Sequence, residues 1–123
     1  MASEITVDAR LMAESGYFAS DRRVAGLAVD MAGTGVEEHV QSVGFAAHEQ
    51  ITINADVGTV GWAFFRNLDD TNYVEIGLDV GATFYPFAKL EPGEAALMRL
   101  AVSAIYAQAN TAAVDLLCHI LEA

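Results

Sequence analysis

The sequence predicts a single, mainly all-β domain of the β-sandwich or jelly-roll class. Apolar residues alternate with polar residues along many short segments, which is typical of strands that bury one face. Turn-forming residues recur about every 8–12 residues, as they do in sandwiches and jelly rolls. The chain has 123 residues, 54% of them hydrophobic and only 2 of them proline. We therefore expect residues 1–123 to form one domain around one core, without a linker.

The first part of the chain is expected to form short strands. Between residues 5 and 14, the apolar side chains of Ile5, Val7 and Leu11 alternate with polar ones, which predicts a half-buried strand with one face in solvent. Residues 1–10 are a candidate N-terminal arm or edge strand that pairs with the sheet edge of a neighbour. Further short strands are expected within residues 27–31, 40–45 and 50–54, the first ending at the turn sequence AGTG.

A hairpin is predicted in the middle of the chain. The apolar run VGWAFFRNL, residues 60–68, leads to the turn formers DDTN, after which Val74, Ile76 and Leu78 face one way. The closely spaced oxygen ligands of DDTN resemble part of a calcium loop. They lack the alternate ligand spacing, the glycine and the distal glutamate of an EF-hand. We interpret residues 69–72 as a turn closed by side chain to backbone hydrogen bonds.

The C-terminal third, residues 94–121, fits two patterns. Its alanine content and the spacing of its leucines are compatible with helices, one of them capped by Thr111. The strand pattern is supported by a tight turn at EPGE, a second turn at QANT, and the alternation of Val114, Leu116 and Cys118 with polar residues. We expect strands here, with a short helix as the alternative.

Composition and charge favour a protein partner. The chain has 6 Lys+Arg against 17 Asp+Glu, a net charge of −11, and a mean hydropathy of +0.32. A negative surface opposes binding to nucleic acid and to anionic membranes, so neither is expected as a partner. Apolar residues beyond what one small core absorbs indicate an interface. We therefore expect obligate assembly.

The N-terminus and the single cysteine give further expectations. The start of the chain has neither a basic region nor an apolar region of a signal peptide, and no apolar run reaches the ~18–20 residues of a membrane span. We expect a soluble protein made in a cytoplasm. Cys118 lies in the apolar sequence LLCHIL and is expected to be buried and inert. It is not expected to act with His119, because adjacent residues of a strand point to opposite faces.

No pattern predicts catalysis, a cofactor or a metal. The spacing of His39, His48 and His119 matches no zinc signature, and the serines lie in no nucleophile motif. The glycine-containing sequences are neither a P-loop nor a dinucleotide fingerprint, and Lys89 is the only lysine. We therefore expect no catalytic residue, no cofactor and no metal ligand, and a protein that is not an enzyme.

The aromatic residues allow two interpretations. Exposed rings of Trp62, Tyr73 and Tyr85, with Phe84 and Phe87, could form a sugar-stacking platform, as in a carbohydrate-binding module. The simpler interpretation places Trp62, Phe64 and Phe84 in the core and Tyr73 or Tyr85 at its rim, with the hydroxyl group in water. We favour the second interpretation and keep the first as an alternative.

Residues 40–122 contain a series of characteristic motifs: VQSVGFAAHEQITI, then NLDDTNYVEIG, FYPFAKLEPGEAA and YAQANTAAVDL, followed by ILE. With these motifs the segment resembles small proteins encoded among the virion genes of tailed bacteriophages and prophages. The resemblance implies a β-sandwich or jelly-roll building block without transferable catalytic residues. It also favours strands in the C-terminal third, although EAALMRLAVSA departs towards helix.

The resemblance implies a structural component of a virion, assembled in the host cytoplasm. We expect a capsid decoration or cement protein that binds the head lattice as a homo-oligomer, with a trimer favoured. A tail, neck or fibre-base protein is the alternative within this class. The expected partners are other copies of the chain and the major capsid protein or another virion protein. The candidate interface residues are Ile5, Val7, Tyr73, Tyr85 and Phe87.

Overall fold

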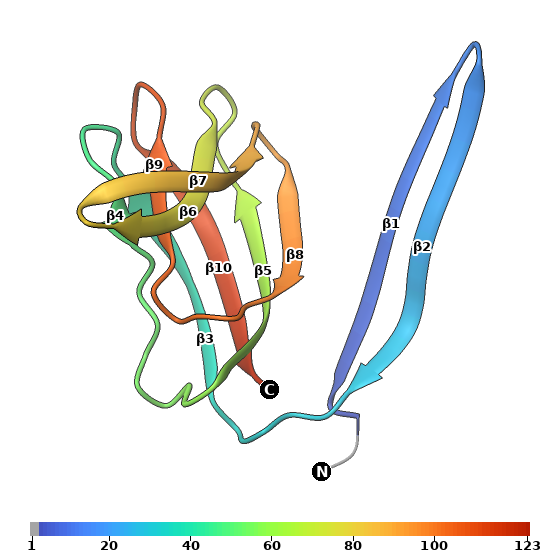
Figure 1. Cartoon of the computed structure of the whole chain (residues 1–123), viewed down its shortest axis with the longest axis horizontal. Coiled ribbons are helices and arrows are strands. Elements are labelled where there is room, and N and C mark those ends of the chain that lie inside the picture. The colour runs from blue at the N-terminus through green and yellow to red at the C-terminus, as the bar shows by residue number, and fades with distance from the viewer. Residues whose placement is uncertain (1–2) are drawn as a thin grey trace.

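A computed structural model of the chain describes residues 3–123 (Figure 1). These residues form ten β-strands and no helix. The strands are β1 (Ile5–Ser15), β2 (Phe18–Val29), β3 (Val36–Val43), β4 (Glu49–Gln50), β5 (Val60–Asn67), β6 (Val74–Val80), β7 (Thr83–Leu90), β8 (Ala95–Arg99), β9 (Tyr106–Ala109) and β10 (Val114–Glu122). The all-β prediction is confirmed, and the helical alternative for residues 94–121 is wrong.

In the described part of the chain the strands form two four-stranded antiparallel sheets and a separate two-stranded hairpin. One sheet has the order β3-β10-β5-β8 and the other the order β4-β9-β6-β7. The two sheets pack face to face, which makes the domain a β-sandwich, while the hairpin β1–β2 stands away from both (Figure 1). The sandwich predicted from the sequence is therefore confirmed.

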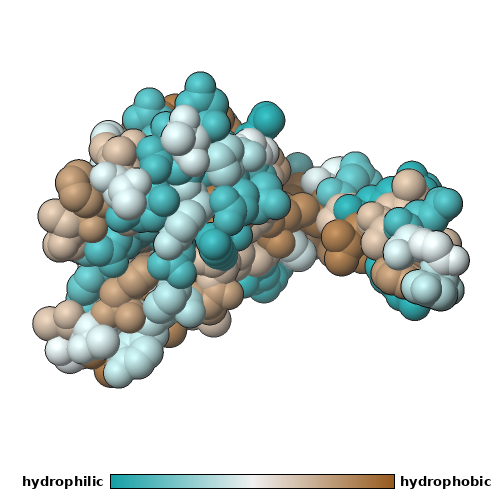
Figure 2. Space-filling model, turned by 90° about the horizontal axis from the view of Figure 1, so that it is seen from above, coloured by the Kyte–Doolittle hydropathy of each residue, from teal (hydrophilic) through white to brown (hydrophobic). Residues whose placement is uncertain are grey.

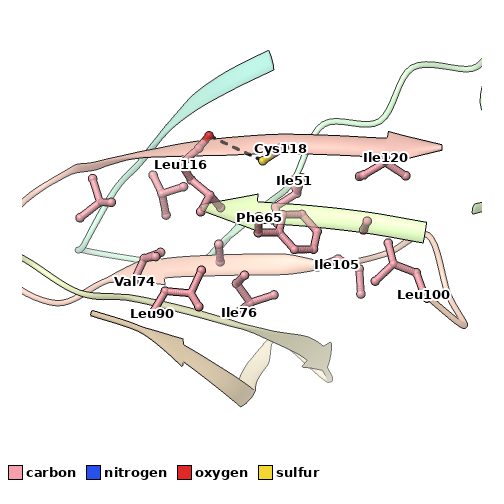
Figure 3. Close-up of a cluster of buried hydrophobic side chains, with 14 of the residues drawn as sticks. Ile51, Phe65, Val74, Ile76, Leu90, Leu100, Ile105, Leu116, Cys118 and Ile120 are labelled. Carbon is pink, nitrogen blue, oxygen red and sulfur yellow. Dashed lines mark hydrogen bonds between the residues drawn. The ribbon is translucent and has the colours of Figure 1, made fainter. Parts of the chain in front are cut away.

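The core lies between the two sheets (Figure 3). Alternate residues of β5 and β10 point into it from one side, and those of β6 and β9 from the other. Phe65, Ile76 and Leu116 are fully buried there, so these strands bury one face as the alternation predicts. Cys118 is also buried, and burial, with a smaller contribution from Glu37, raises the pKa of its thiol to about 12. His119 points to the opposite face of β10, as expected from strand geometry.

The C-terminal third forms strands because its small alanine side chains can be buried between the two sheets. In β9, Ala107 and Ala109 are buried between the neighbouring strands β4 and β6, while Tyr106 and Gln108 point outward. Alanine has a high intrinsic helix propensity. Burial of alternate side chains against the opposite sheet outweighs this local preference.

The hairpin predicted across residues 60–80 is wrong, because β5 and β6 lie in different sheets. The chain between them crosses from one sheet to the other, so that Phe65 and Ile76 enter the core from opposite sides. Asn67, which is fully buried, stabilises this crossing with hydrogen bonds. Its side-chain amide donates to the carbonyl oxygens of Asn72 and Leu90, both at 2.9 Å, and its oxygen accepts from the backbone N–H of Asp69 at 2.8 Å.

The turn predicted at EPGE is confirmed, and it also crosses between the sheets, from β7 to β8. The backbone N–H of Glu94 donates to the carbonyl of Glu91 at 3.0 Å, and Gly93 has a positive φ of 81°. Asn67 joins this crossing to the previous one, because its backbone accepts from Gly93 and donates to Glu94. One buried asparagine thus connects both crossings at the same end of the sandwich.

Candidate assembly surface

The most prominent feature of the surface is the hairpin β1–β2. Its strands pair antiparallel from Ile5 opposite Val29 to Ser15 opposite Phe18, with a turn at Gly16 and a bulge near Gly26. The hairpin projects from the sandwich as a separate lobe joined by a narrow neck (Figures 1 and 2). The sequence patterns indicate strands in this region but do not predict that they pair with each other. The signal that could have paired them is the ESGY turn between two alternating segments.

The base of the hairpin is attached to its own domain. Ile5 and Val7 are each 5% exposed. They line a groove of about 280 Å³ together with Trp62, Phe64 and Leu97 of the sandwich. Hydrophobic residues fill the neck between the two lobes (Figure 2). Ile5 and Val7, expected as interface residues, therefore have little surface left for another copy.

Beyond its base the hairpin exposes apolar side chains. Leu11 and Met12 are 76% and 64% exposed, and Phe18, Val24 and Leu27 are exposed as well. The half-buried strand predicted for residues 5–14 is thus correct only for its first residues. The remainder of β1 contacts chiefly β2, and the sandwich does not cover it.

The two faces of the hairpin differ in chemistry, since residues directly opposite each other in an antiparallel pair share a face. One face, here called the apolar face, carries the opposed pairs Val7/Leu27, Ala9/Val24 and Leu11/Arg22. The other face carries the opposed pairs Thr6/Ala28, Arg10/Arg23 and Met12/Asp21. On it Arg10 donates to Asp21 at 2.8 Å, and this hydrogen bond raises the pKa of the Arg10 guanidinium.

The sheet β3-β10-β5-β8 has a second unusual surface on the side away from the core, here called the outer face. Across this face the residues lie in rows that follow the strand register. One row runs Val40, Leu117, Arg66, Ala95; the next runs Glu38, His119, Phe64, Leu97; and Val36 lies opposite Leu121 in the row after that. The hairpin base covers the part around Phe64 and Trp62. Val36 and Val40 on the edge strand β3 remain exposed.

Charge is distributed unevenly between the hairpin and the rest of the chain. Residues 5–29 hold three of the six basic residues and an equal number of carboxylates, so the net charge of −11 lies outside the hairpin. Within residues 3–123, Arg22 and Arg23 have no carboxylate at ion-pair distance. The hairpin thus presents unpaired positive charge, whereas the sandwich is strongly acidic.

The other predicted interface residues lie on the second sheet or, for Tyr73, directly before its strand β6. Tyr85 and Phe87 are exposed on the edge strand β7, and the Lys89 ammonium lies 4.2 Å from the centre of the Tyr73 ring. Trp62 lies on the outer face of the opposite sheet, beside the hairpin base. The fold therefore does not bring Trp62, Tyr73 and Tyr85 onto one surface, as a common sugar-stacking platform would require.

The three histidines each contact a single carboxylate. His48 lies 2.7 Å from Asp79 and stacks on Phe84, His39 lies 3.1 Å from Glu37, and His119 lies 2.5 Å from Glu38. The hydrogen bond from His48 lowers the pKa of Asp79. In the described part of the chain, no group of three or more His, Cys, Asp or Glu residues could hold a metal ion.

The DDTN segment is a turn, as interpreted from the sequence. The Asp69 carboxylate accepts from the backbone N–H groups of Thr71 at 3.0 Å and Asn72 at 2.6 Å. These bonds, that of Asn72 first, lower the pKa of Asp69. The carboxylate is therefore used to close the turn.

Comparisons with protein-family models, curated proteins and solved structures find no match to this chain. Among residues 3–123 there is no helix long and apolar enough to cross a membrane.

Proposed function

We propose that this protein is a non-enzymatic structural component of a bacteriophage virion, a decoration or cement protein that binds the head lattice as an oligomer. The resemblance of residues 40–122 to proteins encoded among virion genes supports the proposal that the chain is part of a virion. The single observation that carries the structural role is the projecting hairpin, which exposes apolar side chains around Leu11 and Val24. The expected lattice partner is the major capsid protein or another virion protein.

The hairpin is suited to joining a neighbour for two physical reasons. A two-stranded ribbon is at best marginally stable in water, so a surface that covers one of its faces stabilises it. Both of its long edges also carry unpaired backbone groups, which can pair with a strand of another subunit. Exposed apolar side chains on such a ribbon are more consistent with a contact surface than with a solvated loop.

The test shortens the hairpin and leaves its base in place. Ala9 and Val24 lie opposite each other, so residues 10–23 can be replaced by an Asn-Gly turn that joins them. Ile5 and Val7 then keep their packing on the sandwich. We expect the shortened chain to fold, as judged by circular dichroism and thermal unfolding, and to be lost from purified particles, as measured by quantitative mass spectrometry.

The matched control changes a turn without shortening a hairpin. Replacing Gly81 and Ala82, the turn between β6 and β7, by Asn-Gly suits their positive φ values and should leave incorporation unchanged. Normal incorporation of the shortened chain would contradict the proposed role of the hairpin. The copy number places the protein within the particle: on the order of hundreds favours head decoration, and about 6 or 12 favours a tail or neck component.

A further inference from the structure

We infer that the apolar face of the hairpin binds the outer face of the sheet β3-β10-β5-β8 in a second copy of this chain. The contact would therefore be made between the hairpin of one copy and the sandwich of the next. This goes beyond the proposed function, because it identifies the partner of the hairpin and requires no virion.

The first support is a contact of the same kind within one chain. Ile5 and Val7, at the base of the apolar face, already pack against the outer face near Trp62 and Phe64. The same face continues along β1 through residues that the sandwich does not cover, including Leu11. The exposed part of the apolar face therefore continues the same apolar surface that, at Ile5 and Val7, already packs on the outer face.

The second support is the match in shape between the two surfaces. On the hairpin, opposed pairs of the apolar face recur every second residue along β1, which corresponds to about 6.6 Å. On the outer face, Val40 opposite Leu117 and Val36 opposite Leu121 are separated by the pair Glu38 and His119. Both surfaces are thus ridged with the period of a strand, which lets side chains of one lie between rows of the other.

The third support is charge complementarity. Arg22 shares the apolar face with Leu11, and no carboxylate of residues 3–123 lies at ion-pair distance from it. Glu38 lies on the outer face between the two valine positions of β3, and its side chain is 63% exposed although it contacts His119. Arg66 lies on β5, in the same row as Val40. If the hairpin lay with Arg22 towards β5, the two arginines would repel each other. The hairpin is therefore oriented with Arg22 towards β3.

The two surfaces make each copy complementary to another copy. Every chain offers one hairpin and one outer face, so copies can exchange hairpins reciprocally in a two-fold dimer or in sequence around a closed ring. The contact buries apolar surface that one small chain leaves in water. The trimer expected from the sequence is one such ring.

The test compares neighbouring positions on opposite faces of the hairpin. We expect the unmodified chain to form an oligomer in size-exclusion chromatography with light scattering. Leu11→Glu should weaken this oligomer at least about tenfold in dissociation constant, because it buries a carboxylate in the contact. Met12→Glu, at a similar exposure on the other face, is the matched control and should leave association unchanged.

A second pair of variants tests the outer face. Val40 is 53% exposed on β3, and Val80 is 61% exposed on β6 of the other sheet. Val40→Glu should weaken association as Leu11→Glu does, and Val80→Glu should not. Arg22→Glu should also weaken it, and adding Glu38→Arg to the same chain should restore it.

The outcomes separate this inference from the proposed function. The inference is overturned by a chain that stays monomeric up to about 500 μM, a concentration at which even weak interfaces associate. It is also overturned if Met12→Glu or Val80→Glu dissociates the oligomer as strongly as its counterpart. A monomer that still depends on its hairpin for incorporation into particles would leave the proposed function in place.

Discussion

Replacing Asn67 by leucine tests how the two sheets are joined. Leucine has nearly the same size and shape, so the change removes hydrogen bonds without opening a cavity. The Asn67 side chain makes three of them, to Asn72, Leu90 and Asp69, at 2.8–2.9 Å and in a site with no solvent exposure. Each bond contributes about 1 kcal/mol net, and buried partners left unpaired cost more.

The expected loss for Asn67→Leu is therefore about 3 kcal/mol in the free energy of unfolding. For a chain of 123 residues, an unfolding entropy of about 0.26 kcal/mol/K converts this into a fall in Tm of about 12 °C. Urea unfolding followed by tryptophan fluorescence measures the free energy, and differential scanning calorimetry measures Tm. Because both crossings between the sheets meet at this residue, a cooperative loss of the whole domain is expected.

Asn54→Leu is the matched control. The Asn54 side chain donates to the carbonyl of Val36 and accepts from the N–H of Asp56, both at 2.9 Å, but it lies where water can replace these bonds. Its loss should cost no more than about 1 kcal/mol. A loss for Asn67→Leu below about 1 kcal/mol, or equal to that of the control, would refute the assignment of Asn67 as the link between the sheets.

Three further predictions concern the sandwich. Gly77→Ala should lower the free energy of unfolding by about 2–3 kcal/mol, since its Cβ would clash with the backbone oxygen of Tyr85 in β7, whereas Gly44→Ala, whose Cβ would lie 3.6 Å from the nearest atom, should be tolerated. The urea midpoint should fall as the pH drops below about 4, because backbone hydrogen bonds lower the pKa values of Glu122 and Asp69 in the folded state. The stability that these groups contribute is complete above the ordinary carboxyl pKa and is lost as the pH falls through the pKa of the folded state. Glu122→Gln should therefore reduce the loss of unfolding free energy on acidification. Cys118 should react with Ellman's reagent only after unfolding, because it is buried and its pKa is about 12; reaction in the native protein at pH 8 would contradict this.

Much of the fold could be predicted from the sequence because strand burial has a period of two. The alternation of Val114, Leu116 and Cys118 identified β10 against the helix propensity of its neighbours. Which strands pair could not be predicted in the same way. The sequence between Asn67 and Asn72 reads as a hairpin turn, but a buried asparagine redirects the chain to the opposite sheet. The redirection also uses the hydrogen bond from Asn67 to the carbonyl of Leu90, a contact distant in sequence that no local pattern encodes.

The candidate surface was only partly accessible to sequence analysis. Surplus apolar residues indicated an interface, and the N-terminal segment was a candidate arm. Residues 1 and 2 of that segment lie outside the described residues, and residues 5–10 belong to a hairpin that extends to Val29. The pattern of Ile5 and Val7 is identical to that of Leu11, yet the first two are buried and the third is exposed. Alternation identifies a face but not whether the same chain covers it.

The narrow attachment of the hairpin has a mechanical consequence. The ribbon is held by packing around Ile5 and Val7 and by the single chain segment, residues 30–35, that leads from β2 to β3, so a change in its angle disturbs few contacts of the core. Neighbouring subunits of a closed shell meet at different inclinations where its curvature differs. In the proposed role on a head lattice, a change of angle at this base would let one sequence occupy all such positions without repacking the sandwich core.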